Sequence, residues 1–216
     1  MKLMALEHEF EQALASAQLD LELAASERLQ QYCRRLWDWN SKLNLTRHLD
    51  FASFVNRDLL DTLKLAELIE PAARILDVGS GGGVPGIPLA ILRTDIEVSL
   101  CECIQKKAHA LAGILSEIDL ACPVYADRLE NVLQAVDFDV LTGRAIGPLW
   151  KILKWVQPHW GQFDQLLLHK GPKWVEERAD ARSRGLLNGL SLRKVAEYRI
   201  AGHDADSVIL SIQAKA

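Results

Sequence analysis

The sequence predicts an α/β fold: a mostly parallel sheet with an antiparallel C-terminal strand, preceded by an N-terminal helical extension. Apolar residues recur at three- and four-residue steps over residues 1–70, which is typical of amphipathic helices. After Pro71, short apolar runs alternate with helical stretches, which is typical of βα units. A glycine-rich segment follows the first of these runs. We therefore expect a helical extension over 1–70 and an α/β domain over 71–216.

Within the extension, Leu14, Leu29, Leu36 and their apolar neighbours predict two helices, each with one apolar stripe. We expect a break at Asn44-Leu45-Thr46, because its polar side chains compete for backbone hydrogen bonds. Another helix is expected over 51–69. Glu70-Pro71 should end it, because the residue before a proline disfavours helical backbone.

The second part of the chain predicts strands and helices in alternation. The expected strands are 74–78, 97–101, 123–125, 138–142, 163–169, 190–198 and 207–212. The expected helices are 85–92, 105–118, 129–132, 148–156 and 174–184. A polar turn around Gly202-His203-Asp204 joins the last two strands. It is too short for a crossover connection, so these strands must be antiparallel.

Composition narrows the class of protein. The chain has 216 residues, 49% of them hydrophobic and 25% charged, which is typical of a globular protein. Its net charge of −4 excludes a uniformly basic surface but not a local basic face. The longest uncharged stretch, 78–92, is interrupted by glycines and prolines, and Glu7 precedes any signal-type apolar segment. We expect a cytoplasmic protein with no membrane contact.

The four cysteines do not indicate a disulfide framework, which belongs to small, cysteine-dense secreted chains. They are Cys33, Cys101, Cys103 and Cys122. Cys101 and Cys103 share one face of an expected strand but have no histidine beside them. We therefore expect small buried thiols and no metal site.

The glycine-rich segment is the most informative part of the sequence. Asp77-Val78-Gly79-Ser80-Gly81-Gly82-Gly83 lies between the first expected strand and a helix whose first turn suits Pro85. Gly79, Gly81 and Gly83 permit positive φ and a close approach of a ligand to the backbone. Ligands of open α/β sheets bind at the carboxyl ends of strands. The segment therefore predicts a ligand crevice with Asp77 at its mouth.

Two glycine patterns compete for this crevice. Gly81-x-Gly83-x-x-Gly86 fits a dinucleotide fingerprint, and Asp77-x-Gly79-x-Gly81-x-Gly83 fits the loop of S-adenosylmethionine-dependent methyltransferases. The second is favoured because Gly79 directly follows the strand. Asp77 also suits the cationic amino and sulfonium groups of S-adenosylmethionine and would repel two phosphates. A third possibility is that the glycine-rich segment is a turn that binds no ligand.

Further candidates follow the later strands. Glu102 could accept two ribose hydroxyls, although an acid also suits an ordinary exposed strand end. The Asp-Arg-Leu-Glu segment 127–130 follows the third strand, where an adenine edge would lie. Arg144 follows the fourth strand between two glycines, and its planar fork could hold a carboxylate, a phosphate or a guanine edge, or form a surface salt bridge.

These pieces together resemble the ribosomal RNA small subunit methyltransferase G family, also called glucose-inhibited division protein B. The resemblance extends from about Trp37 to His169. Its motifs are Trp39-Asn40-x-x-x-Asn44-Leu45-Thr46, Arg57-x-x-x-Asp61, the run from Leu76 to Ala90, Lys106-Lys107, Gly143-Arg144-Ala145 and Lys170-Gly171.

The resemblance implies a Rossmann-like class I methyltransferase that moves a methyl group from S-adenosylmethionine to a guanine N7 of small-subunit (16S) ribosomal RNA. It implies S-adenosylhomocysteine as product and ribosomal RNA or the assembling small subunit as partner. We also expect no metal and a monomer. Implied cofactor contacts are Gly79, Val84, Leu129, Glu130 and Arg144, with Arg144 also the catalytic candidate. The basic candidates for RNA contact are Arg57, Lys106, Lys107 and Lys170.

The chain departs from the family pattern at two places. The family usually has Thr-Gly-Ala-Gly-Phe where this chain has Ser80-Gly81-Gly82-Gly83-Val84, so Val84 should pack less on the cofactor. The family often has a histidine where Asp58 stands, and an acid there would repel RNA phosphate.

The residues at the end of the fourth expected strand fit the chemistry of methylation at guanine N7. N7 has a free lone pair and loses no proton on methylation, so no general base is needed. The chain accordingly has Thr-Gly-Arg-Ala there and no Asn/Asp-Pro-Pro-aromatic motif. A small-molecule methyltransferase, a non-catalytic nucleotide-binding module and a nicotinamide enzyme remain as alternatives.

Overall fold

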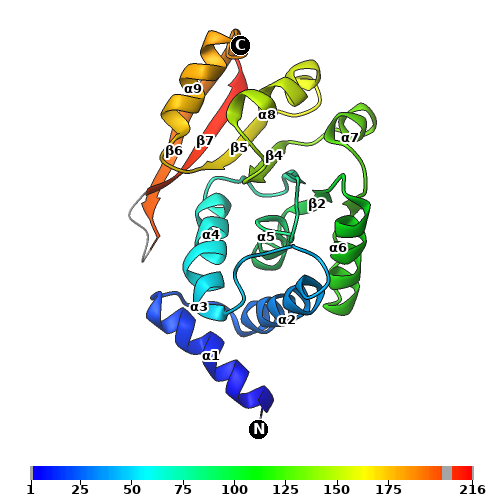
Figure 1. Ribbon diagram of the computed structural model, residues 1–216, viewed down its shortest axis with the longest axis vertical. Coiled ribbons are helices and arrows are strands. Elements are labelled where there is room, and N and C mark those ends of the chain that lie inside the picture. Colours follow the sequence, from blue (N-terminus) through cyan, green and yellow to red (C-terminus); the bar gives the residue numbers. More distant parts are fainter. Residues whose placement is uncertain (1, 201–205, 216) are drawn as a thin grey trace.

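The computed structural model describes residues 2–200 and 206–215, with side chains from residue 8 onward (Figure 1). A seven-stranded sheet forms its centre, in the order β3-β2-β1-β4-β5-β7-β6. The strands are β1 (Arg74–Val78), β2 (Glu97–Cys101), β3 (Val124–Tyr125), β4 (Val140–Arg144), β5 (Gln165–Lys170), β6 (Leu190–Arg199) and β7 (Asp206–Ala214). The expected turn at Gly202-His203-Asp204 lies outside the described residues.

Strand direction confirms the predicted fold class. The first five strands pair in parallel, and β7 runs antiparallel to both β5 and β6. Parallel neighbours require crossover connections, and helices supply them between β1 and β2 and between β2 and β3. The carboxyl ends of the parallel strands therefore meet at one edge of the sheet.

Helices surround the sheet on both faces. They are α1 (Lys2–Ser16), α2 (Leu23–Asn40), α3 (Phe51–Ser53), the π-helical turn η1 (Phe54–Leu59), α4 (Leu60–Ala66), α5 (Gly86–Leu92), α6 (Gln105–Glu117), α7 (Leu129–Ala135), α8 (Leu149–Val156), the 3₁₀ turn η2 (Gln157–His159) and α9 (Trp174–Ser183). No helix within the described residues is long and apolar enough to cross a membrane.

Alternate side chains of the strands enter two apolar clusters, one on each face. Ile75 belongs to the cluster that contains side chains of α2, α5 and α6, whereas Leu76 belongs to the cluster formed with α7 and α8. This alternation is the period-two pattern of a strand buried on both faces. The N-terminal helices share the first cluster with the sheet, so their apolar stripes are buried against the α/β part (Figure 1). A division into domains at residue 70 stays a prediction.

Two expected boundaries are wrong in ways that affect the site. The fourth strand is not 138–142 but Val140–Arg144, because Gly143 and Arg144 continue the ladder beside Leu168 and His169. Arg144 is therefore the last residue of a strand, not part of the loop after it. The helix expected over 51–69 ends at Ala66 and contains the π-helical turn η1.

Candidate active site

A cavity of about 460 Å³ opens at the carboxyl edge of the sheet. It lies within the range of small-molecule sites. Its walls come from the ends of β1, β2 and β4 and from α7 and α8. The lining residues are Val78, Gly79, Cys101, Cys103, Asp127, Arg128, Leu129, Glu130, Ala145, Ile146, Lys151 and Trp155. Three predicted cofactor residues, Gly79, Leu129 and Glu130, line this cavity.

The glycine loop needs its glycines for both conformation and space. Gly79, Gly81 and Gly83 have φ angles of +63°, +57° and +98°, in the region that disfavours side chains. A Cβ on Gly79 would stand 2.6 Å from Ile146 Cγ2, inside the cavity wall. A side chain at position 79 would thus fill space that a ligand can use.

Asp77 lies beneath the glycine loop, not at the mouth of the crevice. Its side chain is buried, and Oδ2 accepts a hydrogen bond from the Gly86 amide (3.2 Å). Oδ1 has no hydrogen-bond partner among the described residues. Burial raises the pKa of Asp77 to about 7. The expectation that Asp77 faces the ligand directly is wrong, because its position on β1 turns it toward α5.

Glu102 also supports the loop. Its Oε2 accepts from the Gly81 amide (3.0 Å) and its Oε1 accepts from the Ile104 amide (2.8 Å). The side chain is buried, so the alternative of an exposed strand end is wrong. A carboxylate can accept further hydrogen bonds through its remaining lone pairs, so a contact to ribose stays a prediction.

The N-terminal helices close over the same loop. The Tyr32 hydroxyl on α2 donates to the Gly82 carbonyl (2.7 Å), and a Cβ on Gly82 would stand 2.9 Å from the Leu45 carbonyl oxygen. Asn40 Oδ1 accepts from the amides of Leu45 and Thr46, which fixes the segment after α2 at the expected break. The helical extension is therefore part of the loop's support.

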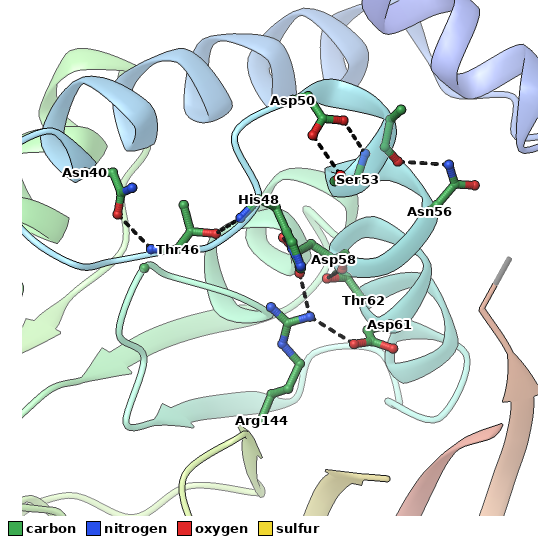
Figure 2. Close-up of polar contacts among 12 residues, drawn as sticks. Asn40, Thr46, His48, Asp50, Ser53, Asn56, Asp58, Asp61, Thr62 and Arg144 are labelled. Carbon is green, nitrogen blue, oxygen red and sulfur yellow. Dashed lines mark hydrogen bonds and ion pairs between the residues drawn. The ribbon is translucent and has the colours of Figure 1, made fainter. Parts of the chain in front are cut away.

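Arg144 forms the centre of a buried charge cluster (Figure 2). Its Nη1 lies 2.6 Å from Asp58 Oδ1 and donates to Asp61 Oδ2 at 2.9 Å. His48 Nδ1 lies 2.8 Å from Asp58 Oδ2. The Tyr198 hydroxyl donates to the other oxygen of Asp61 (2.6 Å). The guanidinium thus faces the N-terminal helices, and Arg144 is absent from the cavity lining.

The opposite charges in this cluster keep Asp58 and Arg144 ionised. Burial opposes ionisation of Asp58, but the hydrogen bond from His48 and the charge of Arg144 outweigh it and lower the pKa of Asp58. Burial likewise opposes the charge of Arg144, but Asp58 and Asp61 outweigh it and raise the pKa of Arg144. Asp58 is 1% exposed, so it cannot repel RNA phosphate as expected from the sequence.

The four basic RNA candidates have different surroundings. Arg57 and Lys106 are exposed, and Lys107 is half-buried. Lys170 is not a free surface cation: its Nζ donates to the Gly147 carbonyl (2.7 Å) and pairs with Glu177 (2.7 Å). Lys170 therefore anchors the β4–α8 loop, and its assignment to RNA contact stays a prediction.

Sequence reasoning also missed part of the cavity wall. Ile146, Lys151 and Trp155 line the cavity, with Lys151 Nζ 5.3 Å from the centre of the Trp155 ring. The four-residue spacing of Lys151 and Trp155 on α8 is a helical signal that the sequence did contain. Val84 is partly buried against the core and does not line the cavity. Among the described residues, no group of three or more His, Cys, Asp or Glu side chains is arranged so that it could hold a metal ion.

Removal of the Arg144 side chain should destabilise the fold, because two buried carboxylates would lose their counter-charge. We expect Arg144→Ala to lower the free energy of unfolding by about 3–5 kcal/mol, measured by urea denaturation. Lys64→Ala, which breaks the exposed pair with Glu67, should cost no more than about 1 kcal/mol. Unchanged stability of Arg144→Ala together with lost cofactor affinity would place the guanidinium on the ligand instead.

Asp77→Asn should change how stability depends on pH. The folded pKa of about 7 lies above the unfolded value of about 3.9. The stabilisation that this carboxyl contributes is therefore complete below about pH 4 and is lost as the pH rises through about 7. Relative to wild type, Asp77→Asn should gain stability between pH 5 and pH 8 in urea titrations. The exposed Asp137→Asn is the control, and parallel curves for Asp77→Asn and wild type would contradict the raised pKa.

The family of the chain follows from comparison with known proteins. The family model described as rRNA small subunit methyltransferase G matches residues 25–201. A protein of that name from Rhodopirellula baltica is 52% identical over 190 residues, which cover 88% of this chain and 82% of the relative. One from Chromobacterium violaceum is 35% identical over 199 residues, which cover 92% of this chain and 93% of the relative.

Solved structures resemble this fold at low sequence identity. The 23S rRNA methyltransferase ErmE has a TM-score of 0.54 at 19% identity, over 74% of this chain and 69% of ErmE. M. capricolum TrmK, in complex with S-adenosyl-homocysteine, has a TM-score of 0.54 at 14% identity, over 72% and 68%. These likenesses agree with the Rossmann-like methyltransferase sheet. With the family match across most of the chain, they identify the protein as a member of the rRNA small subunit methyltransferase G family.

Proposed function

We propose that this chain transfers a methyl group from S-adenosylmethionine to the N7 atom of a guanine in small-subunit ribosomal RNA. The observation that carries the proposal is the cavity at the carboxyl edge of the sheet, with Gly79 in its wall, in a chain of this family. The proposed cofactor residues are Gly79, Leu129 and Glu130 in the cavity wall, with Asp77, Gly81, Gly83 and Glu102 as supports of the loop.

The cavity has space and both acidic and basic groups for S-adenosylmethionine. The bare backbone of Gly79 leaves room that a Cβ would fill against Ile146, and Leu129 adds an apolar surface. The wall holds the carboxylates of Asp127 and Glu130 beside the basic side chains of Arg128 and Lys151. The amino and sulfonium groups of S-adenosylmethionine can face the acids, and its carboxylate can face a base.

Positioning is the main contribution of the protein to the reaction. The bound donor would supply an electrophilic methyl group on its sulfonium sulfur. Guanine N7 already presents a lone pair, so the chain needs to orient the base and exclude water rather than remove a proton. We assign Arg144 a positioning role: it fixes the end of β4, from which Ala145 and Ile146 enter the cavity wall.

Arg57, Lys106 and Lys107 remain the proposed RNA contacts. They lie on η1 and at the start of α6, outside the cavity lining. A chain with a net charge of −4 is a poor general RNA binder, so its basic groups suit a substrate with a defined shape. We propose ribosomal RNA within the assembling small subunit, and hence action in the cytoplasm. A small-molecule substrate is the alternative.

Transfer of labelled methyl groups tests the function. The purified protein should label small ribosomal subunits from cells that lack it, and mass spectrometry should find the label as N7-methylguanosine. Gly79→Ala should weaken S-adenosylmethionine binding at least about tenfold in calorimetry, since its Cβ would stand 2.6 Å from Ile146 Cγ2. Gly161→Ala is the matched control, because nothing lies within 4 Å of that position. Labelled metabolites with unlabelled subunits would favour the small-molecule alternative.

Charge reversal at Arg57 or Lys107 should separate RNA capture from cofactor binding. We expect Arg57→Glu and Lys107→Glu to raise KM for small subunits several-fold, because each places a negative charge near the RNA backbone. The dissociation constant for S-adenosylmethionine should stay unchanged in calorimetry. Normal methylation rates in both variants at low subunit concentration would show that the RNA contacts lie elsewhere.

A further inference from the structure

A second hollow lies outside the cavity described above. It is a groove of about 480 Å³ between the end of α2 and the first turns of α6. Its lining residues are Trp39, Lys42, Leu43, Gln105, Lys106 and His109. The groove combines a large aromatic ring with basic and amide side chains. No acidic residue is found among the described residues that line it.

The Trp39 ring is held in a fixed position on one wall. A Cβ on Gly113 of α6 would stand 2.9 Å from Trp39 Cζ2, so the indole packs directly against the helix backbone. The His109 ring lies 5.8 Å from the Trp39 ring at an angle of 82°. Trp39 remains partly exposed, so part of its ring is accessible. A rigid, accessible aromatic surface is suited to stacking with a planar ligand.

The lysines around this ring are available for an anion. Lys42 Nζ lies over the Trp39 ring, 5.6 Å from its centre, but Lys42 is exposed, so its side chain can leave the ring face to a stacked base. Lys106 is exposed on the first turn of α6. Neither lysine forms an ion pair with any residue in the described part of the chain. The N-terminal end of α6, a helix of 13 residues, adds a partial positive charge on the same side. The groove therefore has an unbalanced positive charge in a protein of net charge −4.

The groove and the cavity adjoin the same connection between β2 and α6. Cys103 lines the cavity, and Gln105, two residues later, lines the groove, so their Cα atoms are at most about 7 Å apart. Gln105 Nε2 donates to the Ala126 carbonyl (2.6 Å), next to Asp127 in the cavity wall. One RNA segment can thus contact the groove while a neighbouring nucleotide reaches the cavity.

We propose that this groove binds an unpaired nucleotide of small-subunit ribosomal RNA, with its base stacked on Trp39 and its phosphate between Lys42 and Lys106. The inference rests on the proposed function and extends it to Trp39, Lys42 and His109. An aromatic ring beside free cations is how proteins bind single-stranded nucleic acid. Unpaired bases stack on such rings, while lysines pair with the backbone phosphates.

The test compares four variants with wild type for binding to protein-free small-subunit ribosomal RNA at several salt concentrations. Lys42→Glu combined with Lys106→Glu should weaken binding at least about tenfold and lower the slope of log affinity against log salt by about 1–2. Trp39→Ala should weaken binding at least about fivefold, and Trp39→Phe should stay near wild type, because a ring is retained. KM for small subunits should rise while kcat and S-adenosylmethionine affinity stay unchanged.

Lys215→Glu is the charge-matched control. Lys215 is exposed after β7, which ends beside the start of β5, at the sheet edge opposite the cavity. The Lys215→Glu variant should bind RNA like wild type. Thermal melting identifies any loss caused by unfolding of Trp39→Ala, in which case the double lysine variant and Trp39→Phe decide the result.

The possible results of this test separate a failure of the proposed RNA site in the groove from a failure of the proposed function. Normal RNA affinity in the double lysine variant, or equal losses in Trp39→Phe and Trp39→Ala with intact folding, would overturn the stacking site. If wild type methylates small subunits while these variants bind and react normally, the groove does not bind RNA and the proposed function stands. If wild type neither binds nor methylates small-subunit RNA, the proposed function fails. Loss of affinity for assembled subunits but not for protein-free RNA would assign the groove to a ribosomal protein and overturn the proposal.

Discussion

The buried ion cluster of Arg144 is the interaction on which the rest of this structure depends. Arg144 ends a central strand, whereas Asp58 and Asp61 belong to the helices that precede the sheet. Their attraction therefore connects the helical extension with the carboxyl edge of the sheet, where the cavity opens. Tyr198 on β6 donates to Asp61, and His169 Nε2 on β5 donates to its carbonyl oxygen. Because such charges are costly to bury alone, the partners must stay together.

The glycine loop is shaped from both sides. Asp77 and Glu102 hold its amides from the sheet, while Tyr32 holds the Gly82 carbonyl from α2. These acids have become internal supports of the loop. The acidic groups in the cavity wall instead come from the segment after β3, Asp127 and Glu130. Carboxylates that a cationic group can face are thus present at the surface of the cavity, beside the basic side chains of Arg128 and Lys151.

The connection between β2 and α6 joins two chemically different surfaces. Cys103 in this connection lines a cavity with both acidic and basic side chains, whereas Gln105 and Lys106 at the start of α6 line a groove with lysines and no acid among its described lining residues. The excess of positive charge thus lies in the groove, where our proposal places an RNA phosphate. This arrangement explains how a protein with a net negative charge could act on RNA: the positive charge is local.

The sequence by itself determined the fold class, most elements and the glycine loop, because periodicity and glycine conformation are local properties. It also contained the family motifs, and family membership was confirmed. The contacts of Asp77, Lys170 and Arg144 follow only from the tertiary structure. Tyr198 and Asp61 are 137 positions apart, and Arg144 and Asp61 are 83 apart. A charged side chain faces a ligand or a partner according to the neighbours that folding brings beside it, and sequence spacing does not contain that information.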